Sequence, residues 1–286
     1  MDMEENRQAD EKQKFFTLED DFEAIIGGHL KDVVSIEKIP TGWTNYVFCA
    51  KTKSGRRYIF RFPRNDFFAD CIVKEIPFNR FVRTKVGVKT ANLRVLEHNG
   101  RAFSMHPMIK GTPLQAAFPK LSASAKKQLA IELTEYISSL QKVKLPGYTC
   151  PSASHFLEGL SKVNNRDCEN YLSRLEYLRE MELRAGTTVH GDLNPGNIIV
   201  DDEGHVVAVL DYAFITCSCT LHDLARICGR LPADFRDIMI AEFEKKFNTT
   251  VNIVDLDYLI DLWTYVENDY KDYMMRCHPD IIMPSY

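Results

Sequence analysis

The chain has 286 residues, of which 45% are hydrophobic, and its 36 Lys and Arg against 40 Asp and Glu give a net charge of −4. This balance gives no electrostatic footprint for nucleic acid or an anionic membrane, no apolar run approaches the roughly 20 residues of a membrane span, and the polar N-terminus lacks signal-peptide or transit-peptide character. The eight cysteines are scattered without zinc-site spacing, so free thiols in a cytoplasmic protein are expected.

Residues 1–105 are predicted to form a small β-rich lobe that begins with a polar tail at 1–14. A helix follows the capping-box-like Thr17-Leu-Glu-Asp20 and ends at Gly27-Gly28. Alternating β-branched and aromatic residues then predict an antiparallel meander. The expected strands are 33–36, 46–48, 58–62, 93–96 and 102–105, with a helix at about 78–85. Residues 106–113 are typical of a connector, or hinge.

Residues 114–286 are predicted to form a larger, mostly helical lobe. After the Ser122 cap, apolar residues from Leu129 to Leu140 recur at helical spacing on one stripe. The other elements expected are a charged helix at 167–185, a hairpin of strands 198–200 and 206–210, and helices at about 221–230, 233–247 and 255–276. A β-rich lobe, a hinge and a helical lobe together predict an α+β architecture.

The most informative segment runs from Val189 to Asp211 and contains His-Gly-Asp192 and Asn197. Asn197 enters the first strand of the hairpin and Asp211 leaves the second, so the hairpin brings both to one rim. A carboxylate beside a carbonyl oxygen suits Mg²⁺ that bridges phosphates, and Asp192 is placed to orient a nucleophilic hydroxyl. The alternative is a polar hairpin whose Asp and Asn only cap turns. Because all three residues occur together with strands in the required places, the segment predicts phosphoryl transfer.

This segment resembles the aminoglycoside phosphotransferase and choline kinase-like family, small-molecule kinases with a protein-kinase-like fold of two lobes. The likeness runs from about Ile39 to Arg226. It implies that Asp192 is the catalytic base and that Asn197 and Asp211 bind magnesium.

Other residues of the helical lobe acquire roles from the same resemblance. His190 is expected to hold the loop backbone rather than move protons, and Asp223-Leu-Ala225 resembles a helix start of the family that braces the site. The sequence departs from the related patterns at Tyr212-Ala213 and at Thr216–Thr220, which lacks the usual Gly-Asp-Pro. Neither change touches the three chemical residues, so both are interpreted as subfamily differences.

The resemblance also implies a nucleotide site in the first lobe. Pro40-Thr-Gly-Trp-Thr-Asn45 is similar to the loop that covers the nucleotide, with Thr44 as a ligand, although an ordinary hairpin turn gives the same pattern. Arg61 stands where the phosphate-binding cation is expected, opposite the aromatic face of its strand, and the alternative is a solvated arginine. Glu75 resembles the glutamate partner of that cation. Pro77 predicts that Glu75 lies at the entrance of the following helix.

The hinge is expected to hold the nucleotide base through main-chain groups. When Gly111 is aligned with the glycine that follows the hinge in the family, Pro107 and Ile109 face the adenine. Pro107 keeps its C=O for the exocyclic amine, and Ile109 supplies an N–H to the ring nitrogen.

The last helix carries an acidic cluster that offers three interpretations. A solvated acidic face is one. In the second, Glu267, Asp269 and Asp272 divide between solvent and a pocket that receives a cationic substrate. In the third, Trp263 and neighbouring tyrosines form an aromatic cage for a quaternary ammonium such as choline.

The sequence therefore predicts an ATP- or GTP-dependent, Mg²⁺-dependent kinase that acts on a hydroxyl of a small cationic molecule. An aminoglycoside antibiotic is the first expectation, which would make the enzyme a resistance factor. Choline, a sugar or an amino alcohol is the alternative substrate, and a nucleotide-binding pseudokinase or sensor is the alternative class. The intact Asp192, Asn197 and Asp211 favour an active enzyme.

Overall fold

The computed structural model describes residues 13–40, 42–144, 151–163 and 169–278. Several predicted features lie outside the described residues. They are residues 1–12 of the predicted tail, loop residue 41, Cys150, and the start of the expected helix 167–185 with Cys168. By their internal contacts the residues separate into two compact units. Among the described residues, the first unit contains those up to Val73 and Leu93–Met108, and the second contains Lys74–Asn92 and those from Ile109 to His278.

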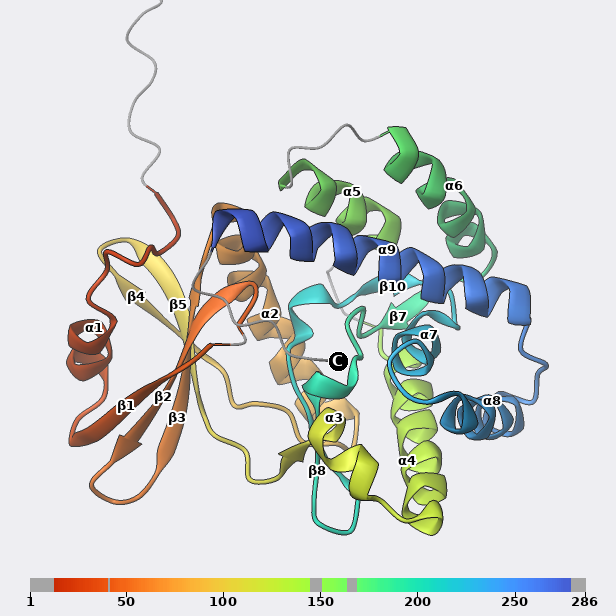
Figure 1. Ribbon diagram of the computed structural model, residues 1–286, viewed down its shortest axis with the longest axis horizontal. Coiled ribbons are helices and arrows are strands. Elements are labelled where there is room, and N and C mark those ends of the chain that lie inside the picture. Colours follow the sequence, from red (N-terminus) through yellow and green to blue (C-terminus); the bar gives the residue numbers. More distant parts are fainter. Residues whose placement is uncertain (1–12, 41, 145–150, 164–168, 279–286) are drawn as a thin grey trace, which may run out of the picture. The chain divides into compact units, whose positions relative to one another are not determined.

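The first unit is built on a five-stranded antiparallel sheet with the order β1-β2-β3-β5-β4 (Figure 1). The strands are β1 Val33–Ile39, β2 Asn45–Thr52, β3 Arg57–Pro63, β4 Arg94–His98 and β5 Arg101–Pro107. All five predicted strands are confirmed, and most run a few residues longer than expected. The helix α1, Phe22–His29, is capped by Asp21, whose side chain accepts the backbone N–H of Ala24.

An aromatic core holds this sheet and α1 together. Phe60 and Phe62 alternate with Arg61 on β3, so both rings point to the same face. On that face the ring of Phe62 lies 5.0 Å from Phe22 of α1 and 4.7 Å from Phe103 of β5. Burial of each such side chain stabilises the fold by about 1.5–3 kcal/mol. The same alternation leaves Arg61 on the opposite face, as predicted.

The helix α2, Asp66–Lys85, corrects the sequence interpretation. It begins at residue 66 rather than about 78, and the side chain of Asn65 accepts the backbone N–H of Phe68 at 3.0 Å as its cap. Glu75 therefore lies inside the helix and not at its entrance. Pro77 is accommodated within the helix, although its ring removes one N–H donor, because buried apolar residues keep helical spacing on both sides of it.

The second unit is mainly helical (Figure 1). Its helices are α3 Leu114–Ala117, α4 Ala123–Gln141, α5 Ala153–Val163, α6 Glu169–Arg184, α7 His222–Cys228, α8 Ala233–Phe247 and α9 Ile253–Cys277. The predicted caps and stripes are present, since Ser122 accepts the N–H of Ala125 and the residues from Leu129 to Leu140 on the apolar stripe of α4 are buried. The sequence did not predict α5. Helices α4 and α7 both pack on α8, and α7 also packs on α9.

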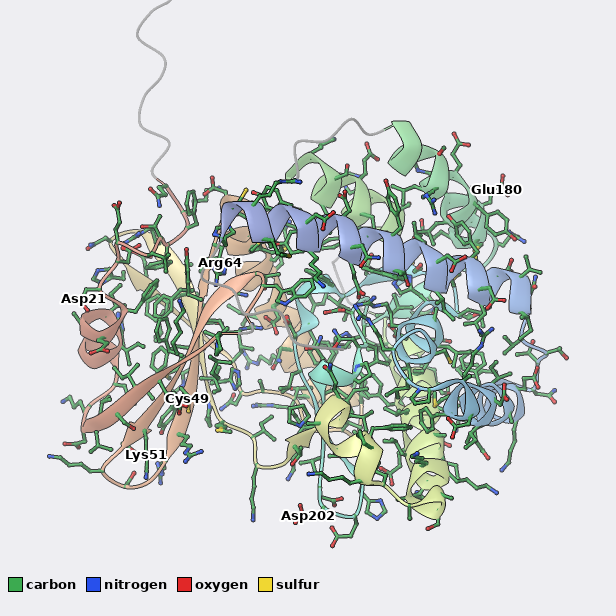
Figure 2. All side chains as sticks on the ribbon, in the orientation of Figure 1. Asp21, Cys49, Lys51, Arg64, Glu180 and Asp202 are labelled. Carbon is green, nitrogen blue, oxygen red and sulfur yellow. The ribbon has the colours of Figure 1, made fainter. Side chains whose placement is uncertain are left out.

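Two small sheets of the second unit carry the segment between residues 187 and 218. Strand β7, Thr187–Val189, pairs with β10, Thr216–Ser218. Strand β8, Ile198–Val200, lies between β6, Thr112–Pro113, and β9, Val206–Val209. The predicted hairpin is thereby confirmed, and Asp202 lies at its tip (Figure 2). A five-stranded antiparallel sheet and a mainly helical unit give the α+β class that the sequence predicts.

Among the described residues, no helix combines the length and the apolar character that crossing a bilayer requires.

Candidate active site

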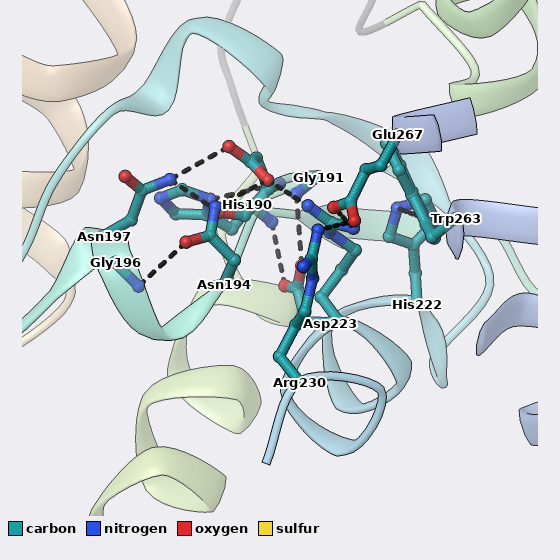
Figure 3. A network of polar contacts seen from close by, with 12 residues as sticks. His190, Gly191, Asn194, Gly196, Asn197, His222, Asp223, Arg230, Trp263 and Glu267 are labelled. Atoms are coloured by element: carbon teal, nitrogen blue, oxygen red, sulfur yellow. Dashed lines mark hydrogen bonds and ion pairs between the residues drawn. The ribbon is translucent and has the colours of Figure 1, made fainter. Parts of the chain in front are cut away.

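The second unit gathers the polar residues of the predicted catalytic segment between β7 and β8 (Figure 3). After β7 ends at Val189, the chain turns at Gly191, whose φ is +81°. A side chain at Gly191 would collide with the carbonyl oxygen of Phe214 and would be strained at this φ. Glycine is therefore required here because two backbone segments meet without space for a Cβ.

Asp223, in the first turn of α7, holds this loop by its backbone. Its carboxylate accepts the N–H of His190 at 2.8 Å and the N–H of Gly191 at 3.1 Å. The side chain is fully buried, and burial raises the pKa of Asp223 to about 7 against these two hydrogen bonds, which lower it. The brace expected from Asp-Leu-Ala is thus confirmed by its contacts.

His190 ties the loop to the end of β9. Its Nε2 donates to the carbonyl oxygen of Leu210 at 3.0 Å, and its Nδ1 accepts the backbone N–H of Asp192 at 3.3 Å. This tautomer uses both ring nitrogens, and burial lowers the pKa of His190, so the ring is held neutral. His190 holds loop backbone, as the sequence resemblance implies.

The carboxylate of Asp192 is oriented by two amides of its own loop. Asn194 donates from Nδ2 to Asp192 Oδ1 at 2.9 Å, and Asn197 donates from Nδ2 to Asp192 Oδ2 at 3.0 Å. Asn197 Nδ2 also reaches the Asp192 carbonyl at 2.9 Å, so its own Oδ1 points to the other side (Figure 3). The sequence did not identify Asn194, although the Asn-Pro-Gly-Asn turn that follows Leu193 was a usable signal.

Asp211 lies beside Asn197 because the residue before it is bonded there. The N–H of Leu210 donates to the carbonyl oxygen of Asn197 at 2.8 Å. Asp211 itself has φ +62°, in the left-handed region, a conformation that costs a non-glycine residue energy and is typical of functional sites. On its other side, the N–H of Tyr212 donates to Glu75 Oε1 at 3.0 Å. The hairpin therefore brings Asn197 and Asp211 to one rim, as predicted.

A cluster that the sequence did not predict surrounds the other side of Asp192. Arg226 of α7 forms an ion pair with Asp192 Oδ1 and, at 2.5 Å, with Glu267 Oε1 of α9. Glu267 Oε2 pairs with Arg230. The guanidinium of Arg226 lies 4.1 Å from the centre of the Trp263 ring. The one usable signal was Arg226 directly after Asp-Leu-Ala, since arginine is seldom buried without a carboxylate partner.

These contacts correct the aromatic-cage interpretation of α9. Trp263 is buried, its Nε1 donates to Nε2 of His222 at 3.1 Å, and its ring is stacked by Arg226 of the same chain. A tryptophan engaged in this way offers no open face to a ligand cation. Of the predicted acidic substrate residues, Glu267 is bound by two arginines, Asp269 is buried and Asp272 is exposed.

Of the nucleotide residues predicted in the first unit, Arg61 and Pro107 lie on strands of its sheet, and Thr44 directly precedes β2. Arg61 is buried and donates from Nε to Ser104 Oγ at 3.1 Å. The carbonyl oxygen of Thr44 accepts the N–H of Arg64 at 3.1 Å. The carbonyl of Pro107 accepts from Nδ1 of His106 at 3.0 Å. Burial, together with nearby Arg61, lowers the pKa of His106 to about 4, so its ring is neutral.

Glu75 and Ile109 belong to the second unit, whereas Arg61 and Pro107 belong to the first. Both the pairing of Arg61 with Glu75 and the two-residue adenine contact stay predictions.

The sequence matches one family model, described as the phosphotransferase enzyme family, over residues 35–252. No curated protein matches. Among solved structures, the GDP complex of wild-type aminoglycoside 2'-phosphotransferase-IIIa is 18% identical, with a TM-score of 0.69 over 91% of this chain and 93% of that chain. The GDP and kanamycin complex of APH(2")-IIia, also 18% identical, has a TM-score of 0.67 over 89% and 95%.

A third similar structure is macrolide 2'-phosphotransferase MphH from Brachybacterium faecium. It is 15% identical, with a TM-score of 0.60 over 92% of this chain and 98% of that chain. At these identities the likeness concerns the fold, and it confirms the protein-kinase-like class that the sequence predicts.

Proposed function

Since the chain belongs to the phosphotransferase enzyme family, we propose that it transfers the γ-phosphoryl group of a nucleoside triphosphate to a hydroxyl of a small molecule. In this proposal Asp192 is the catalytic base, and Asn197 and Asp211 hold magnesium. One observation carries it: the amide of Asn197 bonds to the carboxylate of Asp192 at 3.0 Å, and the residue before Asp211 bonds to Asn197 at 2.8 Å. Hydrogen bonds thus link the proposed base to both proposed metal ligands, from the loop before β8 to the end of β9.

The two oxygens that Asn197 and Asp211 can offer fit magnesium. No group of three or more His, Cys, Asp or Glu side chains that could hold a metal occurs in the described part of the chain. A site with one amide and one carboxylate is typical of Mg²⁺, which keeps several waters and takes its other ligands from substrate phosphates. When bound, magnesium would neutralise charge on the phosphate oxygens and orient them.

The reaction needs one proton acceptor on the protein. The hydroxyl oxygen of the substrate bonds to the γ-phosphorus, the bond from that phosphorus to the β–γ bridging oxygen breaks, and the nucleoside diphosphate leaves with the bond's electrons. Asp192 accepts the hydroxyl proton during this step and later releases it to solvent. Its carboxylate is partly exposed, at 18%, so a substrate can reach it.

The donor site is proposed from the residues that the sequence predicts for it. Buried Arg61 would contact phosphate oxygens, Thr44 lies in the loop proposed to cover them, and the main chain of Pro107 and Ile109 would hold the base. Similar structures contain GDP, ADP or ATP, which supports a purine nucleotide without a choice between ATP and GTP.

The acceptor is the finer part of the proposal. Similar structures are complexes with kanamycin, gentamicin or streptomycin, and others are macrolide 2'-phosphotransferases, so an antibiotic hydroxyl is the first candidate. The pairing of Glu267 with Arg226 and Arg230 favours an acceptor with no ammonium next to the reacting hydroxyl, because this carboxylate is already neutralised. That observation supports a neutral sugar hydroxyl over a polycation.

We place the enzyme in the cytoplasm, where nucleoside triphosphates are available. Six cysteines of the described residues are free thiols, which suits a reducing compartment.

A screen of nucleotide consumption tests the proposal. Purified protein with Mg²⁺ and either ATP or GTP is incubated with aminoglycosides, macrolides, choline and sugars, and Asp192→Asn serves as the blank. We expect turnover with at least one acceptor that falls by about 10²–10⁴-fold in the variant. Turnover that is equal in both proteins would contradict the role of Asp192. Nucleotide binding without turnover across the panel would favour a sensor.

A further inference from the structure

Arg226 is the most deeply buried charged group that contacts the predicted base. Its side chain is 4% exposed, and its guanidinium divides between two carboxylates: Nη2 pairs with Asp192 Oδ1, and Nη1 pairs with Glu267 Oε1 at 2.5 Å. A buried arginine is tolerated only when it is paired and hydrogen-bonded, so these contacts set where the guanidinium can lie. Because arginine presents its donors in a planar fork, fixing one end also fixes the other.

Neighbouring residues hold this fork in place from two sides. The face of the guanidinium lies 4.1 Å from the centre of the Trp263 ring, and Trp263 is itself fixed by its hydrogen bond to His222. Glu267 lies one helical turn after Trp263 on α9, and its second oxygen is occupied by Arg230. His222 in turn bonds through Nδ1 to Ser218 Oγ at 2.9 Å. The position of Arg226 therefore depends on α9 and on the end of β10.

Arg226 occupies one of the hydrogen-bond acceptor positions on the carboxylate of Asp192. Each carboxylate oxygen accepts about two hydrogen bonds. Oδ1 receives Arg226 and Nδ2 of Asn194, the latter at 2.9 Å, and is filled. Oδ2 receives Nδ2 of Asn197 at 3.0 Å, and no other donor from the described residues reaches it. One acceptor position remains, and it is on Oδ2.

We propose that Arg226 is a positioning residue that fixes the carboxylate of Asp192 and assigns Oδ2 as the atom that receives the proton of the acceptor hydroxyl. The proposal rests on the proposed phosphoryl transfer. Arg226 acts through Asp192 and touches neither the transferred group nor the nucleotide. Glu267 is the anchor of Arg226, so it serves the base and not the substrate.

The arrangement has a consequence for rate. Without Arg226, the carboxylate of Asp192 can rotate about its side-chain bond, and both oxygens compete for the acceptor. A misplacement of about 1 Å in a reacting group can cost about 10²-fold in rate. Binding of the nucleotide does not depend on this rotation, so the loss should appear in kcat and not in the nucleotide KM.

The first test compares Arg226→Met, Arg226→Lys, Arg226→Ala and Glu267→Gln with Arg236→Met. Arg236 is a matched control because it pairs with Asp257 at 2.5 Å at the exposed surface of the same unit. We expect Arg226→Met to lower kcat on the order of 10²-fold with the nucleotide KM changed by less than about threefold. Arg226→Lys should keep part of the rate, since a point charge reaches one carboxylate only. Glu267→Gln should lower kcat by about 10-fold.

Chemical rescue separates positioning from structural damage. Millimolar guanidinium should restore part of kcat to Arg226→Ala, because the ion can occupy the vacated fork position, whereas methylammonium at the same concentration should not. Rescue by neither ion, with Arg226→Met at the wild-type kcat, would overturn the proposal. Should Arg226→Met fail to fold, Arg226→Lys and Glu267→Gln give the same comparison.

A double-variant cycle of unfolding midpoints tests the contact without any turnover. Asp192→Asn and Arg226→Met should shift the midpoint together by less than the sum of their separate shifts, because each variant removes the same ion pair. Additive shifts overturn the proposal. If wild-type turnover proves independent of Asp192, the proposed function fails, and this cycle alone decides whether Arg226 positions the carboxylate. If turnover depends on Asp192 but Arg226→Met keeps kcat, only the proposal on Arg226 fails.

Discussion

The loop that carries Asp192 and the cluster around Arg226 meet at one carboxylate but are built from contacts of different span. Within the loop, Asn194 and Asn197 bond to Asp192 across two and five residues. In the cluster, Arg226 bonds to Asp192 across 34 residues and to Glu267 across 41. A short-range contact follows from a turn that the local sequence specifies, whereas the long-range contacts exist only after α7 and α9 have packed.

This difference in span explains why the residues of the loop can be predicted from the sequence and those of the cluster cannot. The loop is a contiguous motif in which Asn194 and Asn197 lie within five residues of their partner Asp192, so the pattern is visible in the sequence. The cluster combines Arg226 of α7 with Trp263 and Glu267 of α9, and no spacing in the sequence relates the arginine to the other two residues. Substitutions in the loop and in the cluster test whether each region holds its structure without the other.

The largest expected effect is at Asp223, the residue of α7 that holds the backbone of the loop. Asp223→Ala leaves the N–H groups of His190 and Gly191 buried without an acceptor. Each such group costs about 1–3 kcal/mol, so the free energy of unfolding should fall by about 2–6 kcal/mol. Urea unfolding followed by circular dichroism measures it, with Asp223→Asn as the milder control. An unchanged midpoint would mean that the loop holds itself and needs no contact from α7.

The next effect concerns the metal side of the loop. Asp211→Ala leaves Asn197 as the only proposed protein ligand of magnesium, so the affinity for the Mg·nucleotide complex should fall by at least about 10- to 100-fold. Asp192→Asn should leave that affinity unchanged. Titration calorimetry with a non-hydrolysable nucleotide, with and without Mg²⁺, measures both. Equal losses in the two variants would show that Asp192, too, contributes to metal binding.

A smaller effect is expected at His222, which accepts the hydrogen bond of Trp263. Burial, with nearby Arg226, lowers the pKa of His222 to about 3, below its ordinary value of 6.5. The folded protein therefore favours the neutral form of the His222 ring. The contribution of this ring to the free energy of unfolding is fully present above pH 6.5 and is lost as the pH falls from 6.5 towards 3. At pH 5 the loss amounts to about 2 kcal/mol.

The difference in unfolding free energy between pH 7 and pH 5 measures this contribution in the wild type and in His222→Gln. The variant should lose less stability over this range, because it has no group at this position to protonate. The buried Asp223 has a raised pKa and therefore changes stability in the opposite direction. Because both proteins contain Asp223, its contribution cancels in the comparison. Identical pH dependence would show that His222 is not the neutral support of Trp263.

The smallest effect is expected at a pair that is also distant in sequence but lies at the surface. Arg236 and Asp257 are 21 residues apart, and the Asp257 side chain is 51% exposed. Arg236→Met should change the free energy of unfolding by about 0.2–1 kcal/mol and should leave turnover unchanged. A large loss of stability or turnover in this variant would mean that the effect of an ion pair depends on its separation in the sequence and not on its burial.

For the fold, the sequence was informative wherever local periodicity decides the structure. Alternation in Phe60-Arg61-Phe62 placed two rings in the core and the arginine on the other face, and Ser122 marked the start of α4. The sequence misplaced the start of α2, because Pro77 was interpreted as a boundary. Buried residues on both sides of this proline hold the helix together, and their burial is a property of the folded chain.

For the site, the sequence predicts Asp192, Asn197 and Asp211 as the chemical residues, and the structure brings them together with His190. These follow from a turn and a hairpin, whose geometry depends on neighbours in the chain. The contacts of Glu267 and Trp263, for which the sequence left three interpretations open, became visible in the tertiary structure alone. Their partner Arg226 lies on another helix, and the cost of burying its charge is offset only where α7 and α9 bring a carboxylate and an aromatic face to it.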